Sequence, residues 1–202
     1  MPDGLASRMA VLAHIERDPA MVEQIKAITW EAWMIEASTP RTMKESVDLF
    51  RMGKAEINAN PDGIDLGGPF LETLMLFGML TREGQLDPTS SEFAQGVALY
   101  DAMLYATPAY AWITTESNTR LDQIAAGRRW LLLNLMATDL GLALHPVSQA
   151  LQEYAEMAAI HAEIHGLLAA PGQTVQMLGR LGYGPMTPPT PRWLLETRLR
   201  DV

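Results

Sequence analysis

The sequence of 202 residues contains no cysteine. Disulfides, thiolate catalysis and cysteine-ligated metals are therefore excluded within it, and its composition fits a reducing compartment. Positive charge is also scarce, because 15 lysines and arginines stand against 24 acidic residues, for a net charge of -9. A chain this acidic lacks the global basic field that nonspecific binding to nucleic acid needs, so we expect no nucleic-acid partner.

Long hydrophobic runs are missing as well. The most apolar stretch, residues 130–147, contains Asn134, Asp139 and His145, whereas a membrane-spanning helix needs about 20 predominantly apolar residues. We interpret the stretch as a buried helix followed by a strand and expect no membrane partner. The first twenty residues have no basic segment followed by an apolar one, which predicts no signal peptide and a cytoplasmic location.

Familiar catalytic motifs do not occur either: there is no G-x-S-x-G, P-loop or Rossmann glycine pattern. His161 and His165 have the four-residue spacing that binds metal on a helix, but no third ligand is indicated. We interpret them as solvated histidines of an amphipathic helix and expect no metal site. Asp62 and Asp65 offer too few oxygens for calcium, and Asp62-Gly63 is more simply a turn.

Strand and helix patterns follow one another without an internal repeat or a long linker. Predicted strands cover residues 7–15, 108–116, 142–147 and 173–184. Predicted helices cover residues 19–37, 40–51, 70–80, 92–105, 119–140, 149–156 and 158–169. Because 48% of the residues are hydrophobic, the chain can bury one sizeable core.

This order of elements suggests an α+β sheet covered by helices. We expect the strand over 7–15 at a sheet edge and the strand over 108–116 at its centre. A single domain over residues 1–202 is expected, mostly helical over 1–104, with a strand-helix-strand core and a C-terminal arm over 105–202.

Local signals are strongest around the helix predicted for residues 119–140. Thr119 and Asp122 have the spacing of a capping box at its start. Gly141 follows its last apolar residue and can take the left-handed conformation that ends a helix. By contrast, residues 58–69 are dense in turn residues and predict a loop.

The proline-rich tail "PMTPPTPRW" predicts an extended arm. Trp193 is expected to anchor this arm onto the body of the protein. Arg192 precedes it on a chain that prolines stiffen, and a guanidinium suits bidentate phosphate binding. A surface arginine on a long tail is the other interpretation of Arg192.

Three segments, in this order, resemble the C-terminal half of the nitroreductase family of FMN-binding oxidoreductases. They are "PAYAWITTE…RLDQIAAGRRWLLLNLMATDLGLALHPVSQAL", "QTVQMLGRLGYG" and "PPTPR". The resemblance covers roughly residues 105–195 and is greatest to the Acg-like, often twin-domain, branch. Residues 8–70 are similar to that branch more loosely, through "DPAMVEQIKAITWEAW" and "DGI".

The resemblance implies a nitroreductase-like α+β fold: a mixed, mainly antiparallel sheet covered by helices, with an N-terminal helical segment. It also implies that flavin lies at a subunit or pseudo-subunit interface. The helix over 119–140 corresponds to a core and interface helix of the family, where Gly127 would allow close helix approach. The family's N-terminal Arg-x-Ser and Asn-x-Gln-Pro-Trp motifs are not found in this sequence. We therefore expect a homodimer or a partner chain that completes the pocket.

By the same resemblance, the cofactor-binding residues are Pro146, Val147, Ser148, Gln149 and Arg192. The first four match the loop beside the flavin ring, where many family members have Glu-Gly at the last two positions. A backbone N–H of this loop can serve flavin N5. Arg192 matches the C-terminal basic residue that contacts the FMN phosphate.

The implied function is that of an FMN-binding oxidoreductase. In a ping-pong reaction, NADH or NADPH would reduce the flavin, which would then reduce a nitro or quinone-type acceptor. The flavin carries this chemistry, so no catalytic side chain is required. The alternative is a flavin-sequestering or structural half-domain of the same fold without turnover.

Overall fold

The computed structural model describes residues 12–185 and 189–199. These residues form two compact units, each with its own internal contacts. Unit 1 takes in the described chain up to Glu36 together with Asp101–Pro185, and unit 2 takes in Ala37–Tyr100 together with residues 189–199. Every helix in the described chain is too short or too polar to cross a bilayer.

Unit 1 is built on a four-stranded sheet in which all neighbouring strands are antiparallel. The strand order is β1-β4-β6-β5, with bounds Leu12–Glu16 (β1), Ala109–Thr115 (β4), Ala143–Pro146 (β5) and Thr174–Gly182 (β6). The predicted central strand is confirmed as β4, and the predicted edge strand as β1. Residues 7–11 of that prediction lie outside the described residues.

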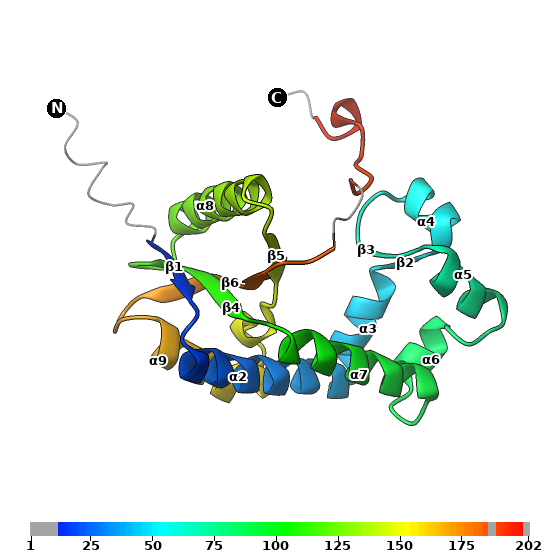
Figure 1. The fold of residues 1–202 in the computed structure, drawn as a ribbon, viewed down its shortest axis with the longest axis horizontal. Helices are drawn as coiled ribbons and strands as arrows, with labels where there is room; N and C mark the ends of the chain where they lie inside the picture. Colours follow the sequence, from blue (N-terminus) through cyan, green and yellow to red (C-terminus); the bar gives the residue numbers. More distant parts are fainter. Residues whose placement is uncertain (1–11, 186–188, 200–202) are drawn as a thin grey trace. The chain divides into compact units, whose positions relative to one another are not determined.

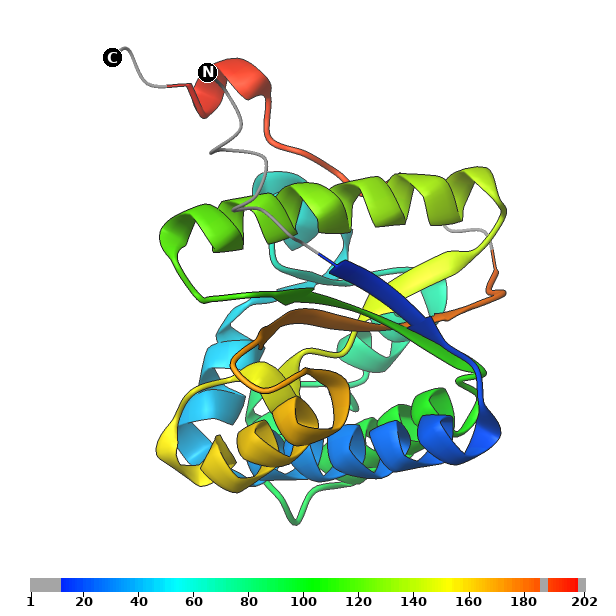
Figure 2. The same cartoon turned by 90° about the vertical axis from the view of Figure 1, so that its left-hand side faces the viewer.

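The helices of unit 1 cover both faces of this sheet. Helix α8 lies on one face, and α2 and α9 lie on the other (Figures 1 and 2). Their bounds are Pro19–Ser38 (α2), Arg120–Asp139 (α8) and Ala158–Leu168 (α9). The helix predicted for 149–156 is wrong: Gln149–Leu151 and Ala155–Met157 form two 3-10 turns. The backbone between them is extended, with ψ 143° at Gln152 and 160° at Tyr154.

The main core of unit 1 lies between the sheet and the helices α2 and α9. Its buried members are Val22, Ile25, Ile28, Ala32, Tyr110, Trp112, Val147, Ala150, Met157, Ile160, Ile164, Leu168, Val175 and Leu178. The Trp112 indole donates to the Leu168 carbonyl at 3.0 Å and so ties β4 to the end of α9. Val147 and Ala150 belong to this core, so the segment that follows β5 is anchored by two buried side chains.

Helix α8 begins as the sequence predicts but is not buried as predicted. The Thr119–Asp122 capping box is present, and Gly141 follows the helix with φ +69°. The helix buries small apolar side chains, namely Ala125, Ala126 and Ala137. Most of the large apolar side chains of the helix and its C-cap are between 46% and 71% exposed: Leu121, Ile124, Leu131, Leu132, Leu135, Met136 and Leu140. The apolar pattern of α8 therefore describes an outward face rather than a core.

One close contact fixes α8 against the sheet. A Cβ atom built on Gly179 of β6 would lie 2.6 Å from Cη2 of Trp130 and 3.0 Å from the carbonyl oxygen of His145. Real Cβ atoms do not approach other atoms so closely, so only glycine allows Trp130 to pack here. Gly179 pairs with Pro146 of β5, which places this contact at the start of the predicted flavin loop.

Unit 2 is mostly helical and contains a short parallel pair of strands. The strands are Phe50–Met52 (β2) and Ile64–Leu66 (β3). The helices are Pro40–Asp48 (α3), Gly53–Ala59 (α4), Pro69–Leu76 (α5), Arg82–Leu86 (α6) and Ser91–Tyr105 (α7, which ends in unit 1), with a 3-10 turn at Leu195–Thr197. The helix predicted for 40–51 is too long because residues 50–52 pair with β3. Residues 58–69, which the sequence predicts as a loop, include strand β3 and so are not a loop throughout.

Substituting Gly179 by alanine tests the contact between α8 and β6. We expect Gly179→Ala to destabilise the protein by about 1–3 kcal/mol, because the added methyl group overpacks the site under Trp130. Gly166→Ala is the matched control, since it adds the same methyl group in α9, where nothing lies within 4 Å. The control should stabilise the helix by up to about 1 kcal/mol. Urea unfolding measures both, and equal midpoints for the two variants would contradict the packing account.

Candidate functional site

The loop predicted to lie beside the flavin ring starts where β5 leaves the sheet. Pro146 is the last residue of β5 and lies opposite Gly179. The Val147 N–H extends the pairing by donating to the Leu178 carbonyl at 3.0 Å. The Val147 side chain is only 1% exposed, so the backbone at the start of the loop has little freedom to move.

Ser148 and Gln149 form the turn itself. Both side chains are half-buried. Ser148 has φ -97° and ψ 12°, and its carbonyl accepts from the Leu151 N–H at 3.0 Å. Within residues 12–185 and 189–199, no protein group accepts a hydrogen bond from the Ser148 N–H. A fixed backbone donor without an acceptor is suited to bind an acceptor atom of a ligand.

His145 precedes this loop and lies opposite Arg180 in the pairing of β5 with β6. Nε of Arg180 donates to Nδ1 of His145 at 3.1 Å, and Nη1 of Arg180 donates to the Met103 carbonyl at 3.3 Å. Burial lowers the pKa of His145, and the positive charge of Arg180 lowers it further. Nδ1 of His145 is therefore the acceptor in this contact, and both effects favour the neutral imidazole.

Arg192 lies in the C-terminal arm, residues 189–199, and is exposed. Its Nη1 atom donates to Oγ1 of Thr190 and to the Pro191 carbonyl, the latter at 3.0 Å. These local bonds hold the guanidinium close to its own backbone. Within the described chain no carboxylate oxygen lies within 4.0 Å of it, so its charge is not compensated by an ion pair.

A small cavity of about 140 Å³ in unit 2 contains Arg192. It is lined by Pro61, Asp62, Gly63, Asp65, Thr190, Pro191 and Arg192. Asp62 does not pair with Arg192. Instead its Oδ1 accepts from Arg51, at 2.8 Å from Nη2, and its Oδ2 accepts from the Trp193 indole at 2.9 Å. The predicted anchoring of the arm by Trp193 is confirmed by this last bond.

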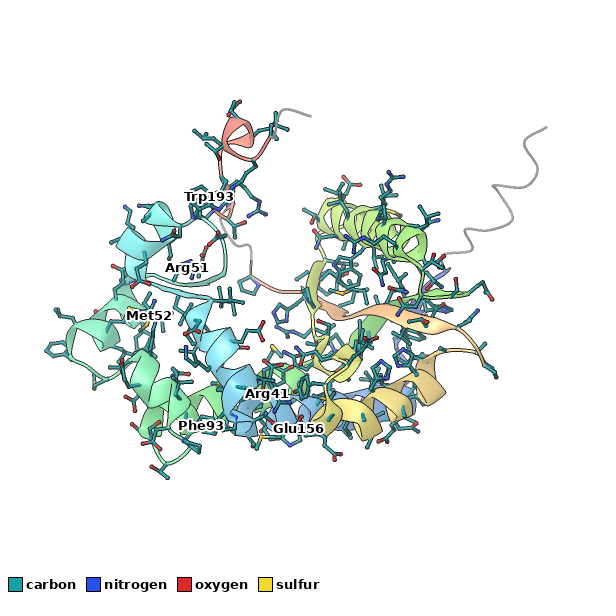
Figure 3. All side chains as sticks on the ribbon, turned by 180° about the vertical axis from the view of Figure 1, so that it is seen from behind. Arg41, Arg51, Met52, Phe93, Glu156 and Trp193 are labelled. Atoms are coloured by element: carbon teal, nitrogen blue, oxygen red, sulfur yellow. The ribbon has the colours of Figure 1, made fainter. Side chains whose placement is uncertain are left out.

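The hydrogen bonds at Asp62 also set its protonation. Donation by Arg51, and then by Trp193, holds the pKa of the Asp62 carboxyl below its usual range. Figure 3 labels Arg51 on β2 and Trp193 on the arm, the two residues that Asp62 connects within unit 2. The sequence gives no local sign of this contact, because Asp62 and Trp193 are 131 residues apart.

The predicted cofactor residues thus belong to different units. Pro146, Val147, Ser148 and Gln149 are consecutive residues of unit 1, whereas Arg192 belongs to unit 2. Among the described residues, the Ser148 N–H has no acceptor and the Arg192 guanidinium has no carboxylate partner.

The histidines of α9 are arranged differently from the prediction. His161 and His165 are half-buried rather than fully solvated, and their rings stack with centroids 4.1 Å apart. Nδ1 of His165 lies 2.8 Å from the His161 carbonyl oxygen. Among the described side chains, no three or more histidine, aspartate or glutamate residues are grouped so as to hold a metal ion.

Comparisons with known proteins relate part of this sequence, and its fold, to nitroreductases. No family model matches the chain. A segment of 82 residues is 37% identical to proteins of Mycobacterium tuberculosis, strains H37Rv and CDC 1551, each named "Putative NAD(P)H nitroreductase". The matched segment is 39% of this chain and only 23% of those relatives' length.

Solved structures extend the comparison over most of the chain. The FMN-dependent nitroreductase NfnB of Mycobacterium smegmatis, solved in complex with NADPH, aligns with a TM-score of 0.52 and 16% identity. The alignment covers 95% of this chain and 78% of that one. A nitroreductase-like family protein of Bacillus cereus aligns with a TM-score of 0.45 and 12% identity over 95% of this chain and 73% of its own.

The fold is therefore nitroreductase-like, with helices on both faces of an antiparallel sheet, as predicted. The relatives from M. tuberculosis and the structural similarity to NfnB support the nitroreductase family. The similarity to NfnB shows only the fold, whereas the match over 82 residues is the observation that supports the nitroreductase family.

The titration of His145 tests the geometry next to the loop. Its folded-state pKa lies below the ordinary value of about 6.5. As the pH falls through 6.5, the unfolded chain takes up this proton first, so His145 lowers the stability of the folded protein. We expect its NMR titration midpoint below 6.5, and a higher midpoint, still depressed by burial, in Arg180→Gln. A wild-type midpoint at or above 6.5 would contradict the described contacts.

Proposed function

We propose that this protein is an FMN-binding, nitroreductase-like oxidoreductase of the Acg-like branch, located in the cytoplasm and acting as one functional domain. The observation that carries the proposal is the 37% identity to proteins named as nitroreductases, in a chain that has the nitroreductase-like fold. When bound, FMN would supply hydride and electron transfer from NADH or NADPH to a nitro or quinone-type acceptor in a ping-pong cycle.

The loop after β5 is the part of the chain that we assign to the flavin ring. Ser148 would donate its backbone N–H to a ring nitrogen, an interaction that does not depend on the side chain. Pro146 and Val147 hold that N–H in place through the sheet pairing and through the burial of Val147. Gln149 begins the 3-10 turn and would line the ring beside Ser148. No proton-transfer side chain is required of this loop.

Arg192 is assigned to the FMN phosphate. Its guanidinium is exposed, has no carboxylate partner within the described chain, and lies on an arm that is anchored at the next residue, Trp193. A charge-assisted hydrogen bond of this type contributes about 1.5–3 kcal/mol. Nearby Asp65 is the group that opposes an anion, because it lines the same cavity.

The exposed face of α8 supports a protein partner, and we propose that the partner is a second copy of this chain. Six large apolar side chains of this 20-residue helix, together with Leu140 at its C-cap, are exposed, and monomeric proteins seldom expose large apolar patches. Gly127 is an exposed residue of the same helix, and a Cβ built on it would meet no atom of another part of the protein within 4 Å. Two α8 helices could therefore approach closely at Gly127.

A second candidate function is a flavin-sequestering or structural domain without turnover. Ser148 and Gln149 favour it, because many family members have Glu-Gly at these positions and the glutamate can carry a proton. Flavin binding is common to both candidates, and only reduction by a nicotinamide separates them.

The visible spectrum of the protein mixed with FMN and then NADPH tests the proposed activity. We expect bound flavin that is bleached anaerobically by NADPH or NADH and reoxidised by a nitroaromatic or a quinone. Ordinary flavin bands that neither nicotinamide bleaches would favour the sequestering domain instead. A protein that takes up no FMN would contradict both candidate functions.

The role of α8 is tested by changing the oligomeric state. We expect a wild-type dimer, and a monomer for Leu135→Glu, because the carboxylate would have to be buried in an apolar interface. Leu99→Glu is the matched control, since Leu99 is an exposed leucine of α7 outside this face, and this variant should remain dimeric. Light scattering after gel filtration measures the three masses. Identical masses for wild type and Leu135→Glu would exclude α8 from an interface.

A further inference from the structure

Asp62 connects the C-terminal arm to the body of unit 2. Both of its carboxylate oxygens are used: Oδ1 accepts from Nε and Nη2 of Arg51 at 3.2 and 2.8 Å, and Oδ2 accepts from the Trp193 indole at 2.9 Å. The other side of Trp193 is covered by Arg198, whose guanidinium carbon lies 4.0 Å from the ring centroid. Trp193 is thus held at its edge by Asp62 and on its face by the arm's own last turn.

The position of Asp62 is itself fixed by β2. The following residue, Gly63, has φ +78°, and a Cβ there would lie 2.3 Å from the Leu49 carbonyl oxygen. That carbonyl accepts from the Ile64 N–H at 2.9 Å, at the start of β3. Asp62 is therefore held beside the small sheet in two ways. The backbone that follows it bonds to Leu49, and its carboxylate accepts from Arg51 of β2.

This arrangement has an electrostatic consequence for Arg192. Asp62 lines the same cavity as Arg192, and an unoccupied carboxylate there would attract the guanidinium or repel a phosphate. Arg51 compensates the charge of Asp62 and occupies one of its oxygens, while Trp193 occupies the other. Arg192, one residue from the anchored Trp193, therefore remains available to an anion.

We propose that Asp62 is a positioning residue for phosphate binding: together with Arg51 and Trp193, it fixes the arm so that Arg192 is presented, unpaired, to the FMN phosphate. Asp62 does not itself contact the phosphate. This proposal rests on the proposed assignment of Arg192 to FMN.

The test compares Asp62→Ala and Trp193→Phe with Asp65→Ala, each in the 202-residue protein. Asp65 is the matched control because it lines the same cavity, and no described hydrogen bond joins it to the arm. Hydrogen exchange of residues 189–199, measured by mass spectrometry without flavin, reports on the arm alone. We expect faster exchange in Asp62→Ala and Trp193→Phe, and wild-type exchange in Asp65→Ala.

Flavin titration then tests the positioning of Arg192. Riboflavin lacks the phosphate, so we expect Asp62→Ala to weaken FMN binding about tenfold or more, the range for a charge-assisted hydrogen bond, and to leave riboflavin binding unchanged. A merely unfolded or loosened protein would lose both ligands. In an Arg192→Ala background, Asp62→Ala should have no further effect on FMN binding, because its effect operates through Arg192.

Two results would overturn the proposal without affecting the proposed function. Unchanged exchange of the arm in Asp62→Ala would show that Asp62 does not fix it. Faster exchange with unchanged FMN affinity would show that the fixed arm does not serve the phosphate. A wild-type protein that binds neither flavin would defeat the proposed function, and the role of Asp62 with it. The exchange data distinguish that case, because the arm would still loosen in Asp62→Ala.

Discussion

Helix α8 lies so close to strand β6 that Trp130 occupies the space above Gly179 where any other residue would place its side chain. Such a close approach requires small residues on the inner face of the helix. These residues are Ala125, Ala126 and Ala137. Apart from Trp130, most of the large apolar side chains then face outward, which leaves an apolar face without a partner in the described part of the chain. Gly179 also pairs with Pro146, so the same contact sets where the loop after β5 leaves the sheet.

The parts of the fold that local chemistry determines were predictable from sequence. The capping box of Thr119 and Asp122 and the apolar, β-branched run of β4 both form as expected. Periodicity could not show which face of α8 is buried, because an apolar stripe indicates only that some surface must cover it. The three-residue strands β2 and β3 are too short to show alternation, and they were missed.

The candidate site likewise has some features that could be predicted from the sequence and others that depend on tertiary structure. The resemblance identified the loop residues and Arg192, whose assignment to flavin remains a prediction. Asp62 could not be found in this way, because "PDGIDLGG" has the composition of a turn whether or not its carboxylate binds anything. Its bond to Trp193 depends on tertiary structure, and so does its pairing with Arg51. Rigid support of this kind is what a binding group needs, since a mobile guanidinium would lose entropy when it binds a phosphate.

In the proposed reaction the flavin carries the chemistry, and the protein has only to bind and position it. In the proposed function, the backbone donor at Ser148 and the cation at Arg192 would serve as binding groups, and neither would have to transfer a proton. The most direct test is therefore a titration of FMN with the wild-type protein, in which quenching of the flavin fluorescence measures binding. The account predicts saturable binding of one FMN for each chain. Fluorescence that remains that of free FMN at every protein concentration would contradict it.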